Sequence, residues 1–215
     1  MKTHIVDTLN HASIVEPEEM RDARLHLEAM LAAVTATEDS GAGQTEITCV
    51  SQGWGKLQTG MSVAETPLCL AGQTFSTGFA VGDDDLGEPE GGPSSTFLGE
   101  QAARHGVWVG GSCPEVPADA PDDDRRPFNS FVLAGPDGTV HRYRKVHPFT
   151  YLGEEKHFRA GTDLVTVEVE NLRVSLFVCY DLRFADEMFS VALDTDLYLV
   201  PANWPESRRH HWTSL

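Results

Sequence analysis

Positive charge is scarce in this chain. Lys and Arg together number 16, against 33 Asp and Glu, which gives a formal net charge of −17 at pH 7. A surface of this sign repels nucleic-acid phosphates and anionic lipid headgroups instead of neutralising them. The composition therefore argues against a nucleic acid and against a membrane as a partner.

Long apolar runs and paired cysteines are also missing. No stretch approaches the roughly 20 apolar residues needed to cross a bilayer, and the first residues lack the apolar core of a signal peptide. The cysteines stand singly, without a Cys-x-x-Cys pair, at Cys49, Cys69, Cys113 and Cys179. Neither a disulfide framework nor a zinc knuckle is expected, and we predict a cytoplasmic protein.

The histidines and acidic runs do not form a pattern typical of metal sites. No two histidines have the His-x-x-x-His spacing beside a carboxylate base, and the acidic triplet at 83–85 suits a solvated loop. Structural or substrate-facing roles are expected for His141, His147, His157, His210 and His211. The sequence predicts neither a metal nor a cofactor.

Hydrophobic periodicity predicts strand–helix units with two antiparallel ribbons, and hence an α/β or α+β layered domain. A helix is expected over 17–34, and Ser94 or Ser95 is expected to cap a second helix that runs through Ala103, with Gly106 after its end. Further helices are expected over 184–193 and from 206 onward. Strands are expected over 3–15, 68–71, 107–111, 128–134, 139–144, 164–170, 172–178 and 196–200. Loops are expected over 82–93 and 114–127, and an irregular insertion over 35–67.

The most informative stretch runs from Leu172 to Phe184. Its first half alternates apolar residues as a buried strand does, and it stops abruptly at Cys179, where a helical pattern starts. A thiol at such a corner lies near a helix N-terminus, so we expect its pKa to fall below the free value of about 8.5. Taken alone, Cys179 has an alternative reading as a small cysteine that packs as a hydrophobe.

Three further motifs accompany this cysteine. They are His141-Arg-Tyr-Arg-Lys145-Val-His-Pro-Phe149, Gly153-Glu154-Glu155-Lys-His-Phe-Arg-Ala-Gly161 and Pro201-Ala-Asn-Trp204-Pro205. Lys145 and Cys179 are 34 positions apart (179 minus 145). Together the motifs resemble the nitrilase (carbon–nitrogen hydrolase) superfamily over about residues 68–215, and within it the ω-amidase-like branch.

The resemblance implies a role for each matching residue. Cys179 corresponds to the nucleophile, Lys145 to the cation that holds the tetrahedral oxyanion, and Glu154 to a second, positioning carboxylate. Substrate contacts are implied for Tyr180, Phe75, Trp204 and Pro205. Chemistry gives similar roles, because amide hydrolysis through a thioester needs a thiolate, a proton acceptor and a positive site for the oxyanion.

One position departs from the family pattern. The general-base glutamate is expected two residues before the Phe of the Phe75-Ser-Thr-Gly-Phe79 motif, and this chain has Gln73 there. An amide cannot take a proton from a thiol at neutral pH. The substitution therefore predicts weak activity or none.

The leading prediction is a cofactor-independent hydrolase of small carboxamides, including the ω-amide of a 2-oxo acid. The resemblance implies a four-layer α-β-β-α sandwich, C-terminally incomplete, that is a homodimer when full length. The length and the 40% hydrophobic content suit one domain over residues 1–215. The alternatives are a catalytically impaired relative that binds a small ligand or a partner, and a hydrolase of nitriles or N-carbamoyl compounds.

Overall fold

The computed structural model describes residues 4–7, 48–49, 68–77, 86–203 and 210 of the chain. The helices predicted over 17–34 and from 206 onward lie outside these residues, as do most of the first predicted strand and most of the 35–67 insertion. Within the described ranges, no helix combines the length and the apolar character that crossing a membrane requires.

A four-stranded sheet carries the stretch that precedes Cys179. Its order is β1-β10-β9-β8, where β1 pairs parallel with β10, β10 parallel with β9, and β9 antiparallel with β8. The bounds are His4–Asp7 for β1, Leu197–Val200 for β10, Leu172–Leu176 for β9 and Val165–Val169 for β8. Each of these strands lies within a range predicted from alternation, so these predictions are confirmed for the described residues.

A second sheet carries the segments that contain Gln73 and Lys145. Its order is β2-β3-β5-β6-β7, with β4 also paired to β5, and β6 pairs antiparallel with both β5 and β7. The bounds are Thr48–Cys49 for β2, Leu68–Leu70 for β3, Glu88–Pro89 for β4, Trp108–Val116 for β5, Phe128–Ala134 for β6 and Val140–Arg144 for β7. The predicted β6–β7 hairpin is confirmed.

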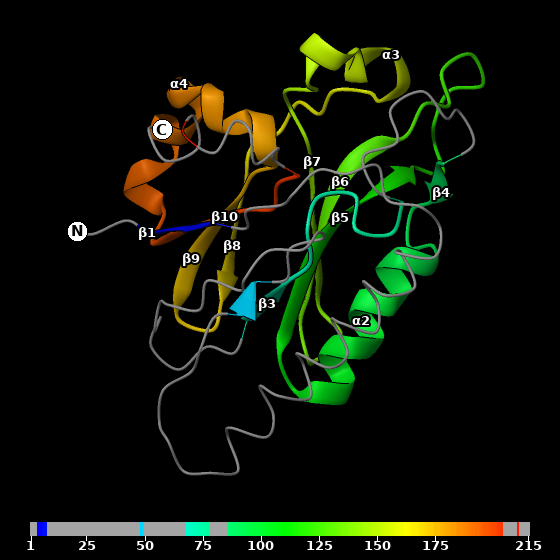
Figure 1. Cartoon of the computed structure of the whole chain (residues 1–215). Coiled ribbons are helices and arrows are strands. Elements are labelled where there is room, and N and C mark those ends of the chain that lie inside the picture. Colours follow the sequence, from blue (N-terminus) through cyan, green and yellow to red (C-terminus); the bar gives the residue numbers. More distant parts are fainter. Residues whose placement is uncertain (1–3, 8–47, 50–67, 78–85, 204–209, 211–215) are drawn as a thin grey trace.

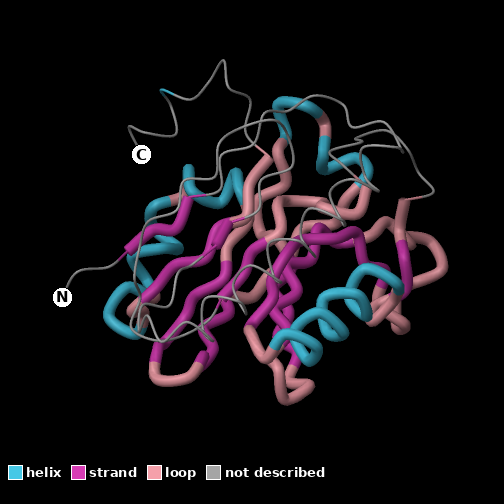
Figure 2. The backbone as a smooth tube through the Cα atoms, turned by 60° about the horizontal axis from the view of Figure 1, so that its bottom comes forward, coloured by secondary structure: helices cyan, strands magenta, loops and turns pink. Residues whose placement is uncertain are grey.

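The two sheets pack against each other through one apolar core, and helix α2 (Pro93–His105) lies against the other face of the second sheet. Figure 1 shows α2 on the flank of β5 and β6 that faces away from the first sheet. Phe131 and Tyr143 of the second sheet share the inter-sheet core with Leu176 and Leu199 of the first. The layers on this side are therefore helix, sheet and sheet, as the tube view of Figure 2 also shows.

Short helices lie at the ends of the strands. The predicted helix over 184–193 is α4 (Ala185–Ser190) followed by the 3₁₀ turn η3 (Ala192–Asp194). The hydroxyl of Tyr198 donates to the carbonyl of Met188 at 2.8 Å, which fastens α4 to β10. In Figure 1, α4 and the short α3 (Glu154–His157) lie toward the same end of the molecule.

The predicted bounds of one strand and three loops are wrong. β5 continues to Val116, although the sequence predicted a strand ending at Gly111 and a loop from Pro114. It continues because it pairs with β6 from Val109 to Glu115 and is buried along almost its whole length, so pairing and burial override the proline signal. The predicted insertion and the 82–93 loop each contain a two-residue strand, β2 and β4, which parallel pairing to β3 and β5 creates.

The start of α2 also differs from the prediction. Gly92 is its N-cap and Pro93 its first residue, not Ser94 or Ser95. Proline is favoured there because the first helical N–H has no partner within the helix. The backbone N–H of Ser94 donates to Oε2 of Glu88, and Oγ of Ser95 accepts from Arg142. Gly106, with φ 67°, follows the helix end as predicted, although the helix runs to His105 and not only to Ala103.

Candidate active site

Cys179 lies at a tight corner between two secondary-structure elements. It follows Phe177 and Val178, which leave β9, and it is the first residue of the 3₁₀ helix η2 (Cys179–Arg183). Its φ of 48° is in the left-handed region, which a non-glycine residue occupies at a cost of about 1–3 kcal/mol. The backbone N–H of Cys179 donates to the carbonyl of Pro201 at 3.0 Å, which ties this corner to the end of β10.

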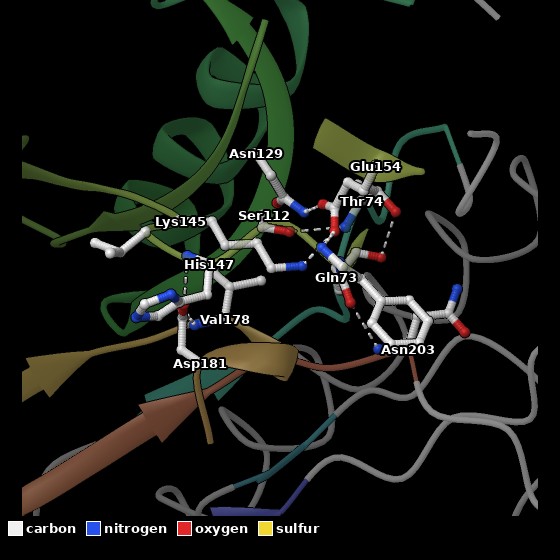
Figure 3. A network of polar contacts seen from close by, with 12 residues as sticks. Gln73, Thr74, Ser112, Asn129, Lys145, His147, Glu154, Val178, Asp181 and Asn203 are labelled. Atoms are coloured by element: carbon white, nitrogen blue, oxygen red, sulfur yellow. Dashed lines mark hydrogen bonds and ion pairs between the residues drawn. The ribbon is translucent and has the colours of Figure 1, made fainter. Parts of the chain in front are cut away.

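Asp181 holds this corner in place, a role that the sequence analysis missed. Its carboxylate accepts hydrogen bonds from the backbone N–H of Val178 and of His147 and from the hydroxyl of Tyr143, at 2.8, 2.9 and 2.8 Å. Val178 precedes the cysteine, whereas Tyr143 and His147 flank Lys145. Asp181 therefore joins the chain around Cys179 to the chain around Lys145 (Figure 3). The available signal was its place in the first turn after Cys179.

Lys145 comes directly after β7 and is only 1% exposed. Its backbone N–H donates to the carbonyl of Asn129 at 3.0 Å, and its carbonyl accepts from the N–H of Gly161 at 2.8 Å. A Cβ at Gly161 would collide with the carbonyl of Arg144, so a glycine is needed for this close approach. The backbone of Lys145 is thus held on both sides before its side chain enters the site.

Glu154 is the ion-pair partner of Lys145. Its Oε2 lies 2.7 Å from Nζ of Lys145, and the carboxylate also accepts from Nδ2 of Asn129 at 3.0 Å and from the N–H of Phe149. The sequence suggested a loop with tight turns at Gly153 and Gly161, but Glu154 is the first residue of the short helix α3 and follows Gly153, whose φ is 77°. That turn directs the fully buried carboxylate inward, and the structure thus brings Lys145 and Glu154 together.

The charges around Lys145 favour an ammonium ion. Burial favours the neutral amine, but the negative charges of Glu154 and Asp181, together with that of an ionised Cys179, outweigh it and raise the pKa of Lys145. Burial also favours the neutral form of Asp181 and so raises its pKa. The charge of Lys145 and the three hydrogen-bond donors to Asp181 oppose this rise. The site therefore holds a fixed positive charge beside Glu154.

The expectation of a lowered pKa for Cys179 is wrong. Burial raises the pKa of this thiol to about 11, and the charge of Lys145 and the N–H of Asn203 only partly oppose the rise. Cys179 is only 8% exposed, and the dipole of a five-residue 3₁₀ helix is too weak to outweigh the desolvation of its thiolate. At pH 7 a pKa of about 11 leaves roughly one thiol in 10⁴ ionised.

Gln73 lies just beyond β3 and is fully buried. Its Oε1 accepts from the backbone N–H of Asn203 at 3.1 Å. The same N–H also bonds to the thiol of Cys179 and partly opposes the rise of its pKa, so Asn203 links Gln73 to the thiol. Thr74, with φ 45°, donates its N–H to Oγ of Ser112 at 2.8 Å, which anchors this turn to β5. In Figure 3, Gln73 points toward Lys145 and Glu154.

The four residues with implied substrate contacts have different locations. Phe75 packs in the apolar core between β5 and α2, with its ring 6.2 Å from that of Phe97, whereas Cys179 belongs to the core between the two sheets. This placement does not support substrate contact by Phe75, because the turn at Thr74 directs its ring to the opposite face of the sheet. Tyr180 is half-buried, and its ring makes edge contacts with Phe149 and Phe184. Trp204 and Pro205 lie outside the described residues.

No three His, Cys, Asp or Glu side chains come together as a metal site in the part of the chain that the structure describes. What the described residues do bring together is a thiol and a buried ammonium that follow strands of two packed sheets, and a buried carboxylate at the start of α3. This combination of groups is typical of hydrolases with a cysteine nucleophile.

Comparisons with known proteins identify the family. The family model for carbon-nitrogen hydrolases matches residues 38–214, and the chain belongs to this family. The solved structure of a CN-hydrolase superfamily protein from Xanthomonas campestris, which has an arsenic adduct in its active site, has a TM-score of 0.69 to this chain at 26% identity. The superimposed residues cover 98% of this chain and 68% of the Xanthomonas campestris chain. The predicted α+β fold of the nitrilase superfamily is thereby confirmed.

Curated relatives match a large part of this chain. The omega-amidase YafV of Yersinia enterocolitica is 36% identical over 154 residues, which make up 72% of this chain and 57% of that protein. The 2-oxoglutaramate amidase of Bacillus subtilis is 25% identical over 146 residues, or 66% of this chain and 54% of that protein. The chain thus spans little more than half the length of these two relatives.

Proposed function

We propose that this chain carries the site of a cofactor-independent amidase, which hydrolyses a small carboxamide to a carboxylate and ammonia. The observation that carries the proposal is the buried ion pair of Lys145 and Glu154. The positive charge of Lys145 acts on the thiol of Cys179. A fixed ammonium beside a thiol is what the oxyanion of a thioester reaction requires. Membership of the carbon-nitrogen hydrolase family supports the same chemistry.

The reaction divides into two steps. In the first, the sulfur of Cys179 attacks the carbonyl carbon, the C–N bond breaks, and ammonia leaves with the proton of the thiol. In the second, water attacks the thioester, which releases the carboxylic acid and returns a proton to the sulfur. Lys145 stabilises the oxyanion in both steps, and Glu154 holds its ammonium in place.

For the substrate we propose the ω-amide of a short 2-oxo acid. The support is similarity to an omega-amidase and to a 2-oxoglutaramate amidase. We propose contacts to this substrate from Tyr180, which adjoins the nucleophile and is half-buried, and from Trp204 and Pro205. The homodimer, the single domain over residues 1–215 and the cytoplasmic location stay predictions from the sequence.

A catalytically impaired relative is the second candidate, and Gln73 favours it. The described contacts of Glu154 are with Lys145, Asn129 and Phe149, and none of the hydrogen bonds between described residues joins it to the thiol. Without a carboxylate at position 73, the thiol loses its proton unaided, and its pKa of about 11 makes that step slow. In this case the site binds a small ligand and releases ammonia poorly.

One assay separates these candidates. The chain and its Cys179→Ala variant are incubated with a 2-oxo acid ω-amide, a simple aliphatic amide and a nitrile, while ammonia and intact mass are followed. The proposal expects ammonia from an amide only when Cys179 is present, and less from the nitrile. Equal ammonia from chain and variant would overturn it. A mass increase on Cys179 without ammonia beyond one equivalent would identify an impaired enzyme that stops at the thioester.

A further inference from the structure

The corner at Cys179 needs support from its surroundings. A non-glycine residue with a φ of 48° stays in the left-handed region only where neighbouring groups hold it there. The carbonyl of Pro201 and the carboxylate of Asp181 hold the main chain at this corner. The side chains that follow on η2 and at its end, Tyr180 and Phe184, are held by a different set of contacts. This second set joins the corner to the chain that follows β7.

Four half-buried rings form a continuous stack beside the candidate site. The ring of His147 lies face to face with that of Phe184, with centroids 3.5 Å apart and planes 8° apart. Phe184 meets Tyr180 edge-on at 5.4 Å, and Tyr180 meets Phe149 edge-on at 4.9 Å. His147 and Phe149 belong to the segment after the buried ammonium, whereas Tyr180 and Phe184 belong to the segment after the thiol. The stack therefore interlocks the two segments that deliver these groups.

Glu187 of α4 fixes the outer end of the stack. Its Oε1 lies 3.0 Å from Nε2 of His147, and because a carboxylate can only accept, Nε2 carries the proton. Aromatic rings attract each other in several offset arrangements, so stacking alone leaves the position of a ring open. The bond to Glu187 selects one position for the imidazole. The backbone N–H of His147 is held by Asp181 (Figure 3), so this residue is fixed at its backbone and at its ring.

Glu154 fixes the other end of the stack. Its carboxylate accepts from the backbone N–H of Phe149, and its own backbone N–H donates to the carbonyl of Phe149 at 3.2 Å. The ring of Phe149 contacts that of Tyr180, which directly follows the cysteine. A shift of the rings therefore changes the position of the thiol relative to the ion pair of Glu154 and Lys145.

We propose that His147 and Glu187 are positioning residues. Their bond locks the ring stack, and the locked stack keeps the strained corner closed, with the thiol of Cys179 buried beside Lys145. Burial is the main cause of the raised pKa of this thiol. When the bond is lost, the corner opens more often and water reaches the thiol, so alkylation becomes faster while attack on a substrate becomes slower. The effect on attack rests on the proposed amidase, whereas the effect on alkylation does not.

Alkylation by iodoacetamide at one fixed pH tests the inference, as the ratio of the labelling rates of Cys179 and Cys113. Cys113 is fully buried in the core under α2 and therefore reports opening of the whole chain. In Glu187→Ala the ratio is expected to rise about two- to tenfold, the range that the loss of one hydrogen bond gives. Asp186→Ala removes an exposed carboxylate from the same helix and is expected to leave the ratio unchanged. An unchanged ratio in Glu187→Ala would overturn the inference.

Steady-state ammonia release separates positioning from a general loss of stability. His147→Ala and Glu187→Ala are each expected to lower kcat about tenfold or more and to change KM less than about twofold, because a misplaced nucleophile attacks slowly. Glu187→Gln keeps an oxygen that accepts from Nε2 and is expected to restore kcat. The double variant is expected to match the single ones, since the pair acts as one unit, and additive losses would contradict this. Absence of ammonia release from the unchanged chain would count against the amidase alone, because the labelling ratio still decides the inference.

Discussion

Glu154 and Gln73 are both fully buried beside Lys145, have side chains of similar length, and differ in how completely their surroundings satisfy them. Three donors converge on the carboxylate of Glu154. The amide of Gln73 accepts one hydrogen bond and has an Nε2 without a partner in the described part of the chain. The surroundings of both residues thus supply donors, which suits a carboxylate at 154 and leaves the amide at 73 in need of an acceptor.

The largest expected effect comes from Gln73→Glu, which places a carboxylate at both positions. Gln73→Glu keeps the acceptor for the N–H of Asn203 and adds a group that can take the thiol proton and return it to ammonia. General-base assistance is worth about 10²–10⁴ in rate, so ammonia release is expected to rise by two or more decades. Gln73→Glu/Cys179→Ala, as a control, is expected to release none. No gain, in a folded chain that hydrolyses the amide, would assign the base to another residue.

Lys145→Ala tests the group that lies between the two residues. Its ammonium stabilises an oxyanion that exists only in the intermediates and nearby transition states. The variant is therefore expected to lower kcat by about 10²–10³ and to change KM much less. Steady-state ammonia release measures both constants. Lys156→Ala removes an exposed lysine of α3 and should leave them unchanged. A change in KM alone would reassign Lys145 to substrate binding.

Glu154→Gln makes the two positions chemically alike. The change leaves the ammonium of Lys145 buried without its counter-charge, and breaking such a pair costs about 3–5 kcal/mol. Urea unfolding should show a loss of this size in the free energy of unfolding. Glu155→Gln, the same change at the neighbouring and less buried position, is expected to shift it by no more than about 0.5 kcal/mol. Similar losses in both variants would show that the buried pair contributes nothing special.

The smallest change per step of the experiment is the pH dependence of Cys179 labelling. Its pKa is raised to about 11, so the thiolate is rare at neutral pH and its fraction grows as pH rises. Alkylation by iodoacetamide, followed on the Cys179 peptide, should speed up about tenfold per pH unit between 7 and 10. Lys145→Ala removes the charge that lowers this pKa and should slow labelling at each pH. A rate that levels off below pH 8 would contradict the raised pKa.

Local patterns predicted the elements that carry the candidate site. Alternating apolar residues with Gly and Pro turns predicted β6 and β7 before Lys145, and the same signal predicted β9 before Cys179. The short helix that begins at Glu154 was missed, because four residues between two glycines have no periodicity to detect. The strand-to-helix corner singled out Cys179, whereas the resemblance to the nitrilase superfamily implied the roles of Lys145, Glu154 and Gln73.

The sequence by itself determined which chemical groups are present, the strands that deliver them, and the glutamine at position 73. Tertiary structure decided what those groups experience. Asp181 bonds to Tyr143 and His147, which are distant in sequence, and only the packing of two sheets brings them together. Burial of the thiol between the two sheets raised the pKa of Cys179, where a helix start predicted the opposite. The contact between Asn203 and Gln73 spans 130 positions, and it orients the amide whose Nε2 has no partner among the described residues.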